Sequence, residues 1–413
     1  MRNMGPDRPL LLVTSGLACF GLLTLYSAGQ TDVPSIAGGA WERQMVWLAV
    51  SAVVIAISFR ISPRLLEWAA PPLYGISVLV LAVTLVIGKG AGTAASSKSW
   101  IVIAGHPIGQ PSELAKIAVV LMLARYLSSR REAPQSLREM MAPCLIAGVP
   151  ALLVLKQPDL GSALVFGGIL FAMLFWASVR PSLLFLLASP VVSLLLAFNL
   201  WTWVGWMVVL GVLMYFWRPY LWEGVVVVIL NIAMGFVALP AWQSLAKYQQ
   251  NRLLTFLNPE ADPQKAGYHA IQSKVAIGSG GWLGNGYLQG PQKRLAFLPA
   301  QHTDFVFSVV GEELGFVGVL VALLLFLYFF WTLIRIARRA TDPFSSLVVF
   351  GLLGLLFTHV FENVGMTVNV MPITGIPLPF FSYGGSFLLA CSLCVGLCLR
   401  VAWDSRMSGY SDT

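Results

Sequence analysis

The stretch Glu313–Ile334, which reads ELGFVGVLVALLLFLYFFWTLI, decides the kind of fold this chain adopts. No residue after Glu313 in this stretch carries a charge at neutral pH. A helix that crosses the hydrocarbon core of a bilayer needs about 20 predominantly apolar residues. The stretch therefore predicts a transmembrane helix.

Similar apolar runs recur along the chain, at 10–29, 41–59, 71–88, 112–127, 141–156, 161–178, 182–199, 201–217, 222–240, 345–362 and 386–403. Charged residues make up 11% of the 413 residues and the mean hydropathy is +0.78, whereas about 25% of an average soluble chain is charged. We therefore predict an all-α polytopic membrane protein with about 12 transmembrane helices in a single domain, 1–413. The first run is expected to be an uncleaved helix, because no persuasive cleavage site follows it.

The positions of the arginines predict how these helices are oriented, because cytoplasmic loops are enriched in Lys and Arg. With both termini inside, one side of the membrane collects Arg2, Arg8, Arg60, Arg64, Arg125, Arg130, Arg131, Arg138, Arg180, Arg218, Arg335, Arg338, Arg339, Arg400 and Arg406. We therefore expect both termini to be cytoplasmic and the large loop 241–312 to be extracytoplasmic. The net charge of +8 then reflects topology, and we expect no nucleic acid partner.

All five cysteines lie within or at the edge of predicted spans, so they suggest no extracellular disulfide framework. Cys391, Cys394 and Cys398 share one apolar helix without His or carboxylate neighbours. Because free Cys behaves as a small hydrophobic residue, we predict that they serve packing and do not bind a metal.

Polar residues gather where the fourth predicted span begins, in the sequence QPSELAK from Gln110 to Lys116. Glu113 and Lys116 are three residues apart, so they lie on one helix face. Ionisable groups at membrane level are costly and by default mark a polar cavity or ion pathway. A purely structural ion pair is the alternative.

Other candidates lie in the predicted outer connections. Asp159 stands in a tight turn before the sixth span, where it could simply cap that helix. Arg43 lies at an outer helix mouth, and Lys98 and Trp100 lie in the outer loop 88–109, where Trp100 could equally be an interfacial anchor.

The segment Leu298–Gly315 concentrates titratable groups between apolar runs, including His302, Asp304, Glu312 and Glu313. Thr303 or Asp304 could cap a helix beginning at Phe305. The predicted topology instead exposes Asp304 to the outside, with Lys293 and Arg294 shortly before it as a cationic patch. Asp304 is therefore the main candidate for chemistry.

The segment 371–386 is apolar but contains three prolines and three glycines, which forbid a regular helix. Non-helical backbone at membrane depth is tolerated where protein buries it or where it lines a wet cavity. We predict a re-entrant outer loop.

Taken in order, these motifs resemble the SEDS family (shape, elongation, division and sporulation). The resemblance rests on Gln110–Glu113, Gln157–Gly161, His302–Phe305, Gly311–Gly315 and the loop from Pro372 to Ser386. Within the family, Ala266–His269 and Gln272–Gly281 are more similar to the elongation branch, whereas Gly311–Glu313 is closer to the division branch.

The resemblance implies a peptidoglycan glycosyltransferase that polymerises lipid II, an undecaprenyl-pyrophosphate-linked disaccharide pentapeptide, on the outer face of the bacterial cytoplasmic (inner) membrane during cell elongation. It implies Asp304 as the catalytic residue, with a substrate-binding set of Arg43, Lys98, Trp100, Gln110, Glu113, Lys116, Asp159, His302 and Thr303. It also implies a divalent cation, Mg²⁺ or Mn²⁺, with unknown ligands. The implied partners are lipid II, a class B penicillin-binding protein, the elongation machinery and membrane lipids.

The chain departs from the family pattern in several places. Family members usually show ten spans, so the prediction here is a ten-helix core plus an extra pair within 182–240. Ala300 stands where Glu is common, Ser99 where Arg is usual and Pro291 where Thr is frequent.

Two other functions compete with this one. A transporter, such as a lipid II flippase, also fits many spans, buried charges and a broken outer segment. We see no clear inverted repeat, and the polar residues concentrate on one face, which disfavours transport. A non-catalytic scaffold for a class B penicillin-binding protein is the third possibility.

Overall fold

Each predicted apolar run corresponds to one helix of the computed structural model, although the runs 41–59, 71–88, 161–178 and 182–199 extend past the ends of their helices. The structure describes residues 6–90, 98–103, 106–245, 247–261, 267–298 and 300–411. The remaining parts of the predicted outer loops, 91–97, 104–105, 246, 262–266 and 299, lie outside the described residues. The first half contains α1 (Arg8–Gly29), α2 (Ala40–Ser58), α3 (Pro63–Ile87), β1 (Ile101–Ile103), β2 (His106–Gly109), α4 (Pro111–Ser128), α5 (Leu137–Lys156) and α6 (Leu160–Trp176). The second half contains α7 (Pro181–Leu196), α8 (Leu200–Trp217), α9 (Leu221–Ser244), α10 (Lys247–Leu257), η2 (Pro259–Ala261), α11 (Tyr268–Ser279), α12 (Pro291–Arg294), α13 (Val306–Arg339), α14 (Pro343–Thr367) and α15 (Gly385–Ser411).

The fold is helical, as predicted, with one short antiparallel pairing between β1 and β2. Within the described residues, nine helices are long and apolar enough to cross a membrane. The helices α6 and α7 are apolar but shorter, with 17 and 16 residues, and α4 carries Glu113, Lys116 and Arg125. The total of 12 spans therefore stays a prediction.

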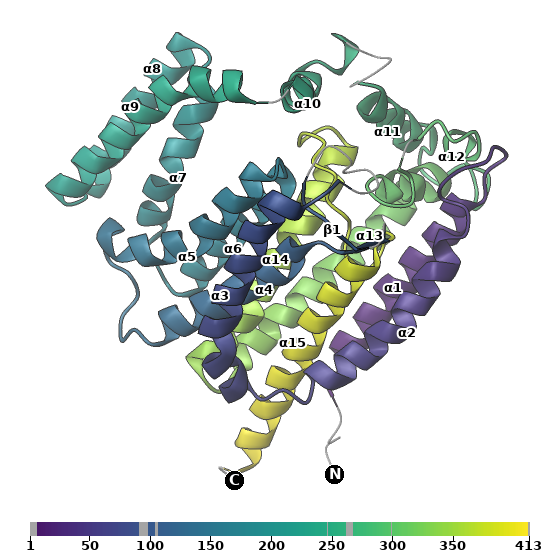
Figure 1. Cartoon of the computed structure of the whole chain (residues 1–413), viewed down its shortest axis with the longest axis horizontal. Coiled ribbons are helices and arrows are strands. Elements are labelled where there is room, and N and C mark those ends of the chain that lie inside the picture. The colour runs from purple at the N-terminus through teal and green to yellow at the C-terminus, as the bar shows by residue number, and fades with distance from the viewer. Residues whose placement is uncertain are drawn as a thin grey trace.

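Both chain ends lie at one end of the helical bundle, and α10, α11 and α12 lie at the opposite end (Figure 1). Buried Asp7 caps α1 and pairs with Arg335 of α13 and Arg406 of α15. These contacts bring three arginine-bearing segments to the same end, as the predicted topology requires. The residues of the candidate site belong to the other end.

The centre of the bundle is formed by the most buried long helices, α14 and α15, with α4, α6 and α13 packed around α14. A helix that is apolar on all sides is stable only when surrounded by other helices or by lipid. Cys391, Cys394 and Cys398 are each about 1% exposed and belong to this core. The packing role predicted for them is confirmed.

Helices α7, α8 and α9 lie to one side of the bundle (Figure 1). They share a small core of Leu186, Leu210 and Val227. Asn231 of α9 is fully buried, and its amide donates to Ser189 Oγ of α7 at 2.9 Å. The segment that holds the predicted extra pair is thus held together internally and contributes little to the central core.

The segment before α15 has no regular secondary structure, and residues 376 and 378–382 are buried, which agrees with the predicted re-entrant outer loop at 371–386. Leu378 and Phe381 are fully buried, and a Cβ placed on Gly21 of α1 would collide with the carbonyl oxygen of Phe380. Gly21 lies eight residues before the end of α1, which corresponds to a depth of about 12 Å along the helix. The loop therefore descends among the helices.

The helix α13 begins at Val306, and Phe305 is its N-cap residue without a side-chain capping bond. The predicted cap by Thr303 or Asp304 is wrong, because the chain makes a turn through 301–305 before the helix begins. The helix also has a kink at Gly315, whose φ is +61°. There the N–H of Phe316 donates to Gly281 of the preceding loop instead of to its own helix.

Candidate active site

Asp304 lies in the turn before α13 and is 6% exposed. The side-chain amide of Asn363 in α14 donates to the backbone oxygen of Asp304 at 2.9 Å and to that of Ile376 at 2.7 Å. A Cβ placed on Gly375 would lie 3.6 Å from Asp304 Oδ2. The carboxylate therefore faces the loop 371–386, which is called the outer loop below. The Asn363 amide holds the backbone of Asp304 and that of this loop together.

The outer loop is joined to the same turn by further hydrogen bonds. Ser382 Oγ donates to the backbone oxygen of Thr303 at 2.5 Å, and the Tyr383 N–H donates to that of His302 at 2.8 Å. Gln44 of α2 donates to the backbone oxygen of Ser382 at 3.2 Å. Two segments that the sequence singles out separately thus form one structural unit.

Lys116 is fully buried and lies next to this unit. Its Nζ is 2.8 Å from Glu113 Oε1, which confirms the predicted proximity of the two side chains on α4. Its second partner is His359 Nε2 of α14, at 2.9 Å. The other ring nitrogen of His359 lies 3.3 Å from the backbone oxygen of Pro377 in the outer loop.

Asp159 and Gln110 are brought together at the start of α6 and α4. Gln110 Nε2 donates to Asp159 Oδ2 at 2.7 Å. The other carboxylate oxygen, Oδ1, accepts from the Ser162 N–H at 3.0 Å, so the predicted capping by Asp159 is confirmed. The Asp159 carboxylate is therefore held in place by α6, which it caps, and by Gln110 at the start of α4.

Three polar residues of α14 belong to the site and are absent from the sequence-based set: His359, Glu362 and Asn363. All are at most 1% exposed. Thr374 of the outer loop donates to Glu362 Oε2 at 3.4 Å, and Oε1 has no hydrogen-bond partner among the described residues. The signal was available for His359 and Glu362, because ionisable side chains inside a predicted span, here 345–362, indicate function by default.

Arg43, His302 and Tyr383 form a cluster beside the turn that carries Asp304. The Arg43 guanidinium lies 5.1 Å from the centre of the Tyr383 ring, and the His302 ring lies 6.0 Å from it. Burial, and secondly the positive charge of Arg43, lowers the pKa of His302 below its usual value. The cluster therefore carries one cation and a neutral imidazole at neutral pH.

Lys98 and Trp100 lie on the connection that leads through β1 and β2 into α4. The Lys98 side chain is exposed, whereas its N–H donates to the backbone oxygen of Gln157 at 3.3 Å. Trp100 is half-buried and pairs through its backbone with Lys89. Neither residue is buried with the Glu113–Lys116 pair.

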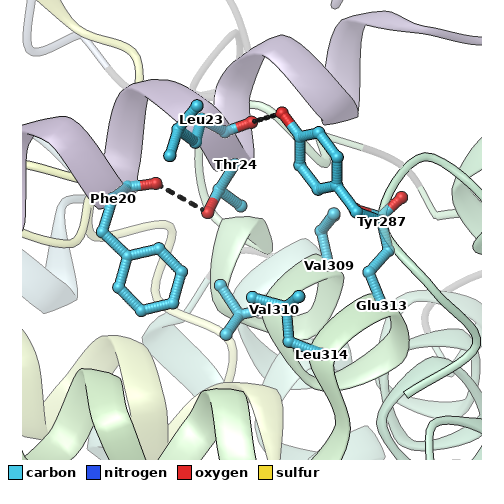
Figure 2. Close-up of a pocket in the computed structure, with 8 residues that line it drawn as sticks. All are labelled: Phe20, Leu23, Thr24, Tyr287, Val309, Val310, Glu313 and Leu314. Carbon is cyan, nitrogen blue, oxygen red and sulfur yellow. Dashed lines mark hydrogen bonds between the residues drawn. The ribbon is translucent and has the colours of Figure 1, made fainter. Parts of the chain in front are cut away.

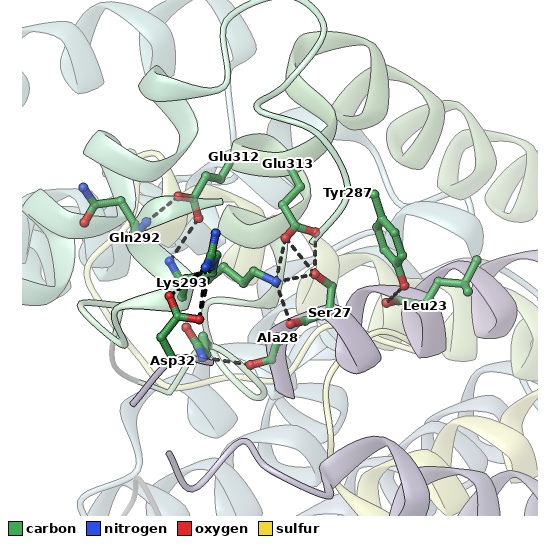
Figure 3. Close-up of polar contacts among 11 residues, drawn as sticks. Leu23, Ser27, Ala28, Asp32, Tyr287, Gln292, Lys293, Glu312 and Glu313 are labelled. Atoms are coloured by element: carbon green, nitrogen blue, oxygen red, sulfur yellow. Dashed lines mark hydrogen bonds and ion pairs between the residues drawn. The ribbon is translucent and has the colours of Figure 1, made fainter. Parts of the chain in front are cut away.

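The cations expected beside Asp304 are engaged with other carboxylates (Figure 3). Lys293 is fully buried, 2.8 Å from Glu313 Oε1 and 2.8 Å from Ser27 Oγ of α1. Arg294 forms an exposed pair with Asp32 at 2.9 Å. This arrangement differs from the open cationic patch predicted from the sequence, because the short α12 packs against the ends of α1 and α13.

Glu313 also borders a cavity of about 200 Å³ between α1 and α13 (Figure 2). The other lining residues are mostly apolar: Phe20, Leu23, Thr24, Tyr287, Val309, Val310 and Leu314. Tyr287 closes one side by donating to the backbone oxygen of Leu23 at 2.9 Å. Burial raises the pKa of Tyr287, and the charge of Glu313 adds to the effect. None of the predicted substrate-binding residues lines this cavity.

No group of three or more His, Cys, Asp or Glu side chains is arranged to hold a metal ion within the part of the chain that is described. The divalent cation implied by the sequence stays a prediction.

Comparison with known proteins shows which family the chain belongs to. The family model of cell cycle proteins for FtsW, RodA and SpoVE matches residues 8–206 and 182–407. The two matches overlap in α7 and the start of α8, inside the segment 182–240 that holds the predicted extra pair. The chain is 35% identical to the peptidoglycan glycosyltransferase MrdB of Escherichia coli K12, over 98% of this chain and 95% of that protein. It is also 35% identical to RodA of Treponema pallidum, over 96% and 97%, and to the probable peptidoglycan glycosyltransferase FtsW of Geobacter metallireducens, over 98% and 96%.

Solved structures agree over the same length. A chain from a peptidoglycan synthase complex that coordinates polymerization and crosslinking superimposes with a TM-score of 0.70, at 31% identity over 97% of this chain and 98% of that chain. The rod shape determining protein RodA of Thermus thermophilus superimposes with a TM-score of 0.62, at 27% identity over 97% of both chains. Sequence motifs, helical fold and family match coincide over nearly the whole chain, so this integral membrane protein belongs to the FtsW/RodA/SpoVE family, the SEDS family.

Proposed function

We propose that this peptidoglycan glycosyltransferase polymerises lipid II during cell elongation, with Asp304 as the general base. The observation that carries the assignment is the placement of Asp304. Asp304 is buried in the turn before α13, its backbone oxygen accepts from Asn363, and its carboxylate faces Gly375.

In the proposed reaction, the 4-hydroxyl of the acceptor GlcNAc attacks C1 of the donor MurNAc. The new bond joins the acceptor O4 to C1, and the bond between C1 and the diphosphate oxygen breaks. Asp304 takes the hydroxyl proton, and undecaprenyl pyrophosphate leaves with the electron pair. A positioned general base contributes roughly 10² to 10⁴-fold to such a step.

The remaining site residues supply charge and orientation. We propose that Lys116, held by Glu113, balances the charge of the diphosphate. We propose that Arg43, which lies over the Tyr383 ring, attracts the anionic headgroup. His302 and Thr303 in the adjacent turn would then contact the headgroup. Gln110, Asp159, Lys98 and Trp100 complete the proposed substrate-binding surface.

We further propose that a divalent cation, Mg²⁺ or Mn²⁺, accompanies the diphosphate. Mg²⁺ usually keeps several waters and is bound through one or two carboxylates plus substrate phosphates. That behaviour agrees with the lack of a three-ligand protein group among the described residues. Removing divalent ions with EDTA should stop polymerisation, and adding them back should restore it.

The test of the function is incubation of the purified protein with labelled lipid II in detergent. Wild-type protein should form glycan polymer, and Asp304→Asn should reduce the rate by roughly 10² to 10⁴-fold. Asp32→Asn is the matched control, because Asp32 is an exposed outer carboxylate paired with Arg294. If Asp304→Asn polymerises at the wild-type rate, the role of Asp304 is wrong.

The same assay separates the competing functions. A lipid II transporter has no reason to make polymer in detergent. A non-catalytic scaffold would make none with or without a class B penicillin-binding protein, the partner we propose. Both termini are proposed to be cytoplasmic, on the basis of the arginines at their end of the bundle.

A further inference from the structure

His359 connects two parts of the site that no hydrogen bond within α4 could join. Its Nε2 lies 2.9 Å from Lys116 Nζ, and its Nδ1 lies 3.3 Å from the backbone oxygen of Pro377. The ring is fully buried, and the Phe387 ring of α15 packs on it with centroids 4.7 Å apart. His359 therefore touches α4, α15 and the outer loop from one position on α14.

The contacts determine which ring nitrogen carries the proton. A lysine ammonium is a donor only, so Nε2 must accept from Lys116. A backbone carbonyl is an acceptor only, so Nδ1–H must donate to Pro377. The ring is thus a neutral imidazole with its proton on Nδ1. It accepts a hydrogen bond from Lys116 and donates one to the outer loop.

These two hydrogen bonds matter because Lys116 and the backbone at Pro377 both belong to the site. Lys116 uses one N–H for Glu113 and one for His359, which leaves its third N–H for another acceptor. Pro377 is two residues after Gly375, the residue that faces the Asp304 carboxylate. A single side chain therefore sets the lysine relative to the backbone that lies against the general base.

We propose that His359 is a positioning residue for glycosyl transfer, which holds the Lys116 ammonium and the outer loop in register with Asp304. This inference rests on the proposed function. His359 does not contact the substrate in this role. It orients Lys116 toward the diphosphate leaving group and keeps the loop against Asp304.

The test compares His359→Gln, His359→Leu and Leu356→Ala in the purified polymerisation assay. Gln can accept from Lys116 through its oxygen and donate to Pro377 through its nitrogen, whereas Leu can do neither. Leu356 is buried one turn away on α14 and is the control for disturbed packing. We expect His359→Leu to lower kcat about 10- to 100-fold, the scale of one lost hydrogen bond to a charged group. KM should change less than kcat.

His359→Gln should recover most of the lost kcat, and Leu356→Ala should keep a kcat near that of the wild type. If His359→Leu does not fold, His359→Asn replaces it, because its shorter side chain cannot reach both partners. A wild-type kcat in the Leu or Asn variant, or a Gln variant as slow as the Leu variant, overturns the proposal. Failure of the wild-type protein itself to polymerise would instead contradict the proposed function.

Discussion

The side-chain amide of Asn363 binds the backbone of Asp304, 59 positions earlier in the chain, at 2.9 Å. The same amide nitrogen also binds the backbone of Ile376 at 2.7 Å. One side chain of α14 thereby fixes the turn that carries the proposed general base and the loop that covers it. The proposed general base, which lies in the turn before α13, is therefore positioned by contacts to its backbone.

Replacing Asn363 should impair both stability and activity. Asn363→Leu removes the donor for two buried carbonyl oxygens, each worth about 1–3 kcal/mol when left unsatisfied. Asn231→Leu is the matched control, because Asn231 is an equally buried amide whose partners lie in α7, α8 and α9. Thermal unfolding in detergent should show a loss for both variants, whereas the polymerisation rate should fall only for Asn363→Leu. Equal rates in the two variants would contradict the role of Asn363.

A side chain at Gly375 should impair activity more than stability. Its φ of +76° is unfavourable for other residues by about 1–2 kcal/mol. A Cβ there would also contact the Asp304 carboxylate. Gly281 has a φ of +53° and open space around its Cβ position, so Gly281→Ala controls for backbone strain alone. We expect Gly375→Ala to lower kcat well below that of Gly281→Ala at similar thermal stability, and similar kcat values would refute this prediction.

Two neighbouring cations should differ sharply in their effect on stability. Lys293→Met leaves the Glu313 carboxylate buried and without its cation, which typically costs about 3–5 kcal/mol. Arg294→Met breaks an exposed pair and should change the free energy of unfolding by about 0–1 kcal/mol. Adding Glu313→Gln to Lys293→Met should restore part of the loss. Thermal unfolding of the three variants measures the difference, and equal midpoints for the two single variants would contradict it.

Acidification should destabilise the protein through His302 and His269. Burial and the charge of Arg43 lower the pKa of His302, and burial and the charge of Arg252 lower that of His269. The unfolded chain, with pKa values of about 6.5 for His, then binds more protons than the folded chain below that pH. These histidines therefore cost no stability above about pH 6.5. The free energy of unfolding decreases as the pH falls from there toward their lowered pKa values in the folded protein.

The measurement is the unfolding midpoint of wild type and His302→Gln between about pH 5 and 8. His302→Gln should lose less stability on the acid side than the wild type. Arg43→Gln should also flatten the dependence, because it removes the second cause of the lowered pKa. An unchanged pH profile in His302→Gln would show that His302 does not contribute.

The chain sequence determined the features that depend on local order. The apolar runs predicted all the long helices, because the length and the hydropathy of a spanning helix can be read from consecutive residues. The Glu113–Lys116 pair and the Asp159 cap were predictable because their partners lie three residues apart. The motifs around Asp304 and the outer loop identified the family for the same reason.

Only the tertiary structure decided which of these pieces meet. Lys116 and His359 are 243 positions apart, and Ser27 and Glu313 are 286 positions apart. Such contacts depend on how helices pack, which no local pattern specifies. The sequence therefore did not predict which residues His359, Glu362 and Asn363 contact, although the first two stand as ionisable groups in a predicted span. It also expected Lys293 beside Asp304, whereas the packing of α12 pairs Lys293 with Glu313. The catalytic candidate could be read from the sequence, whereas the network that holds it required the fold.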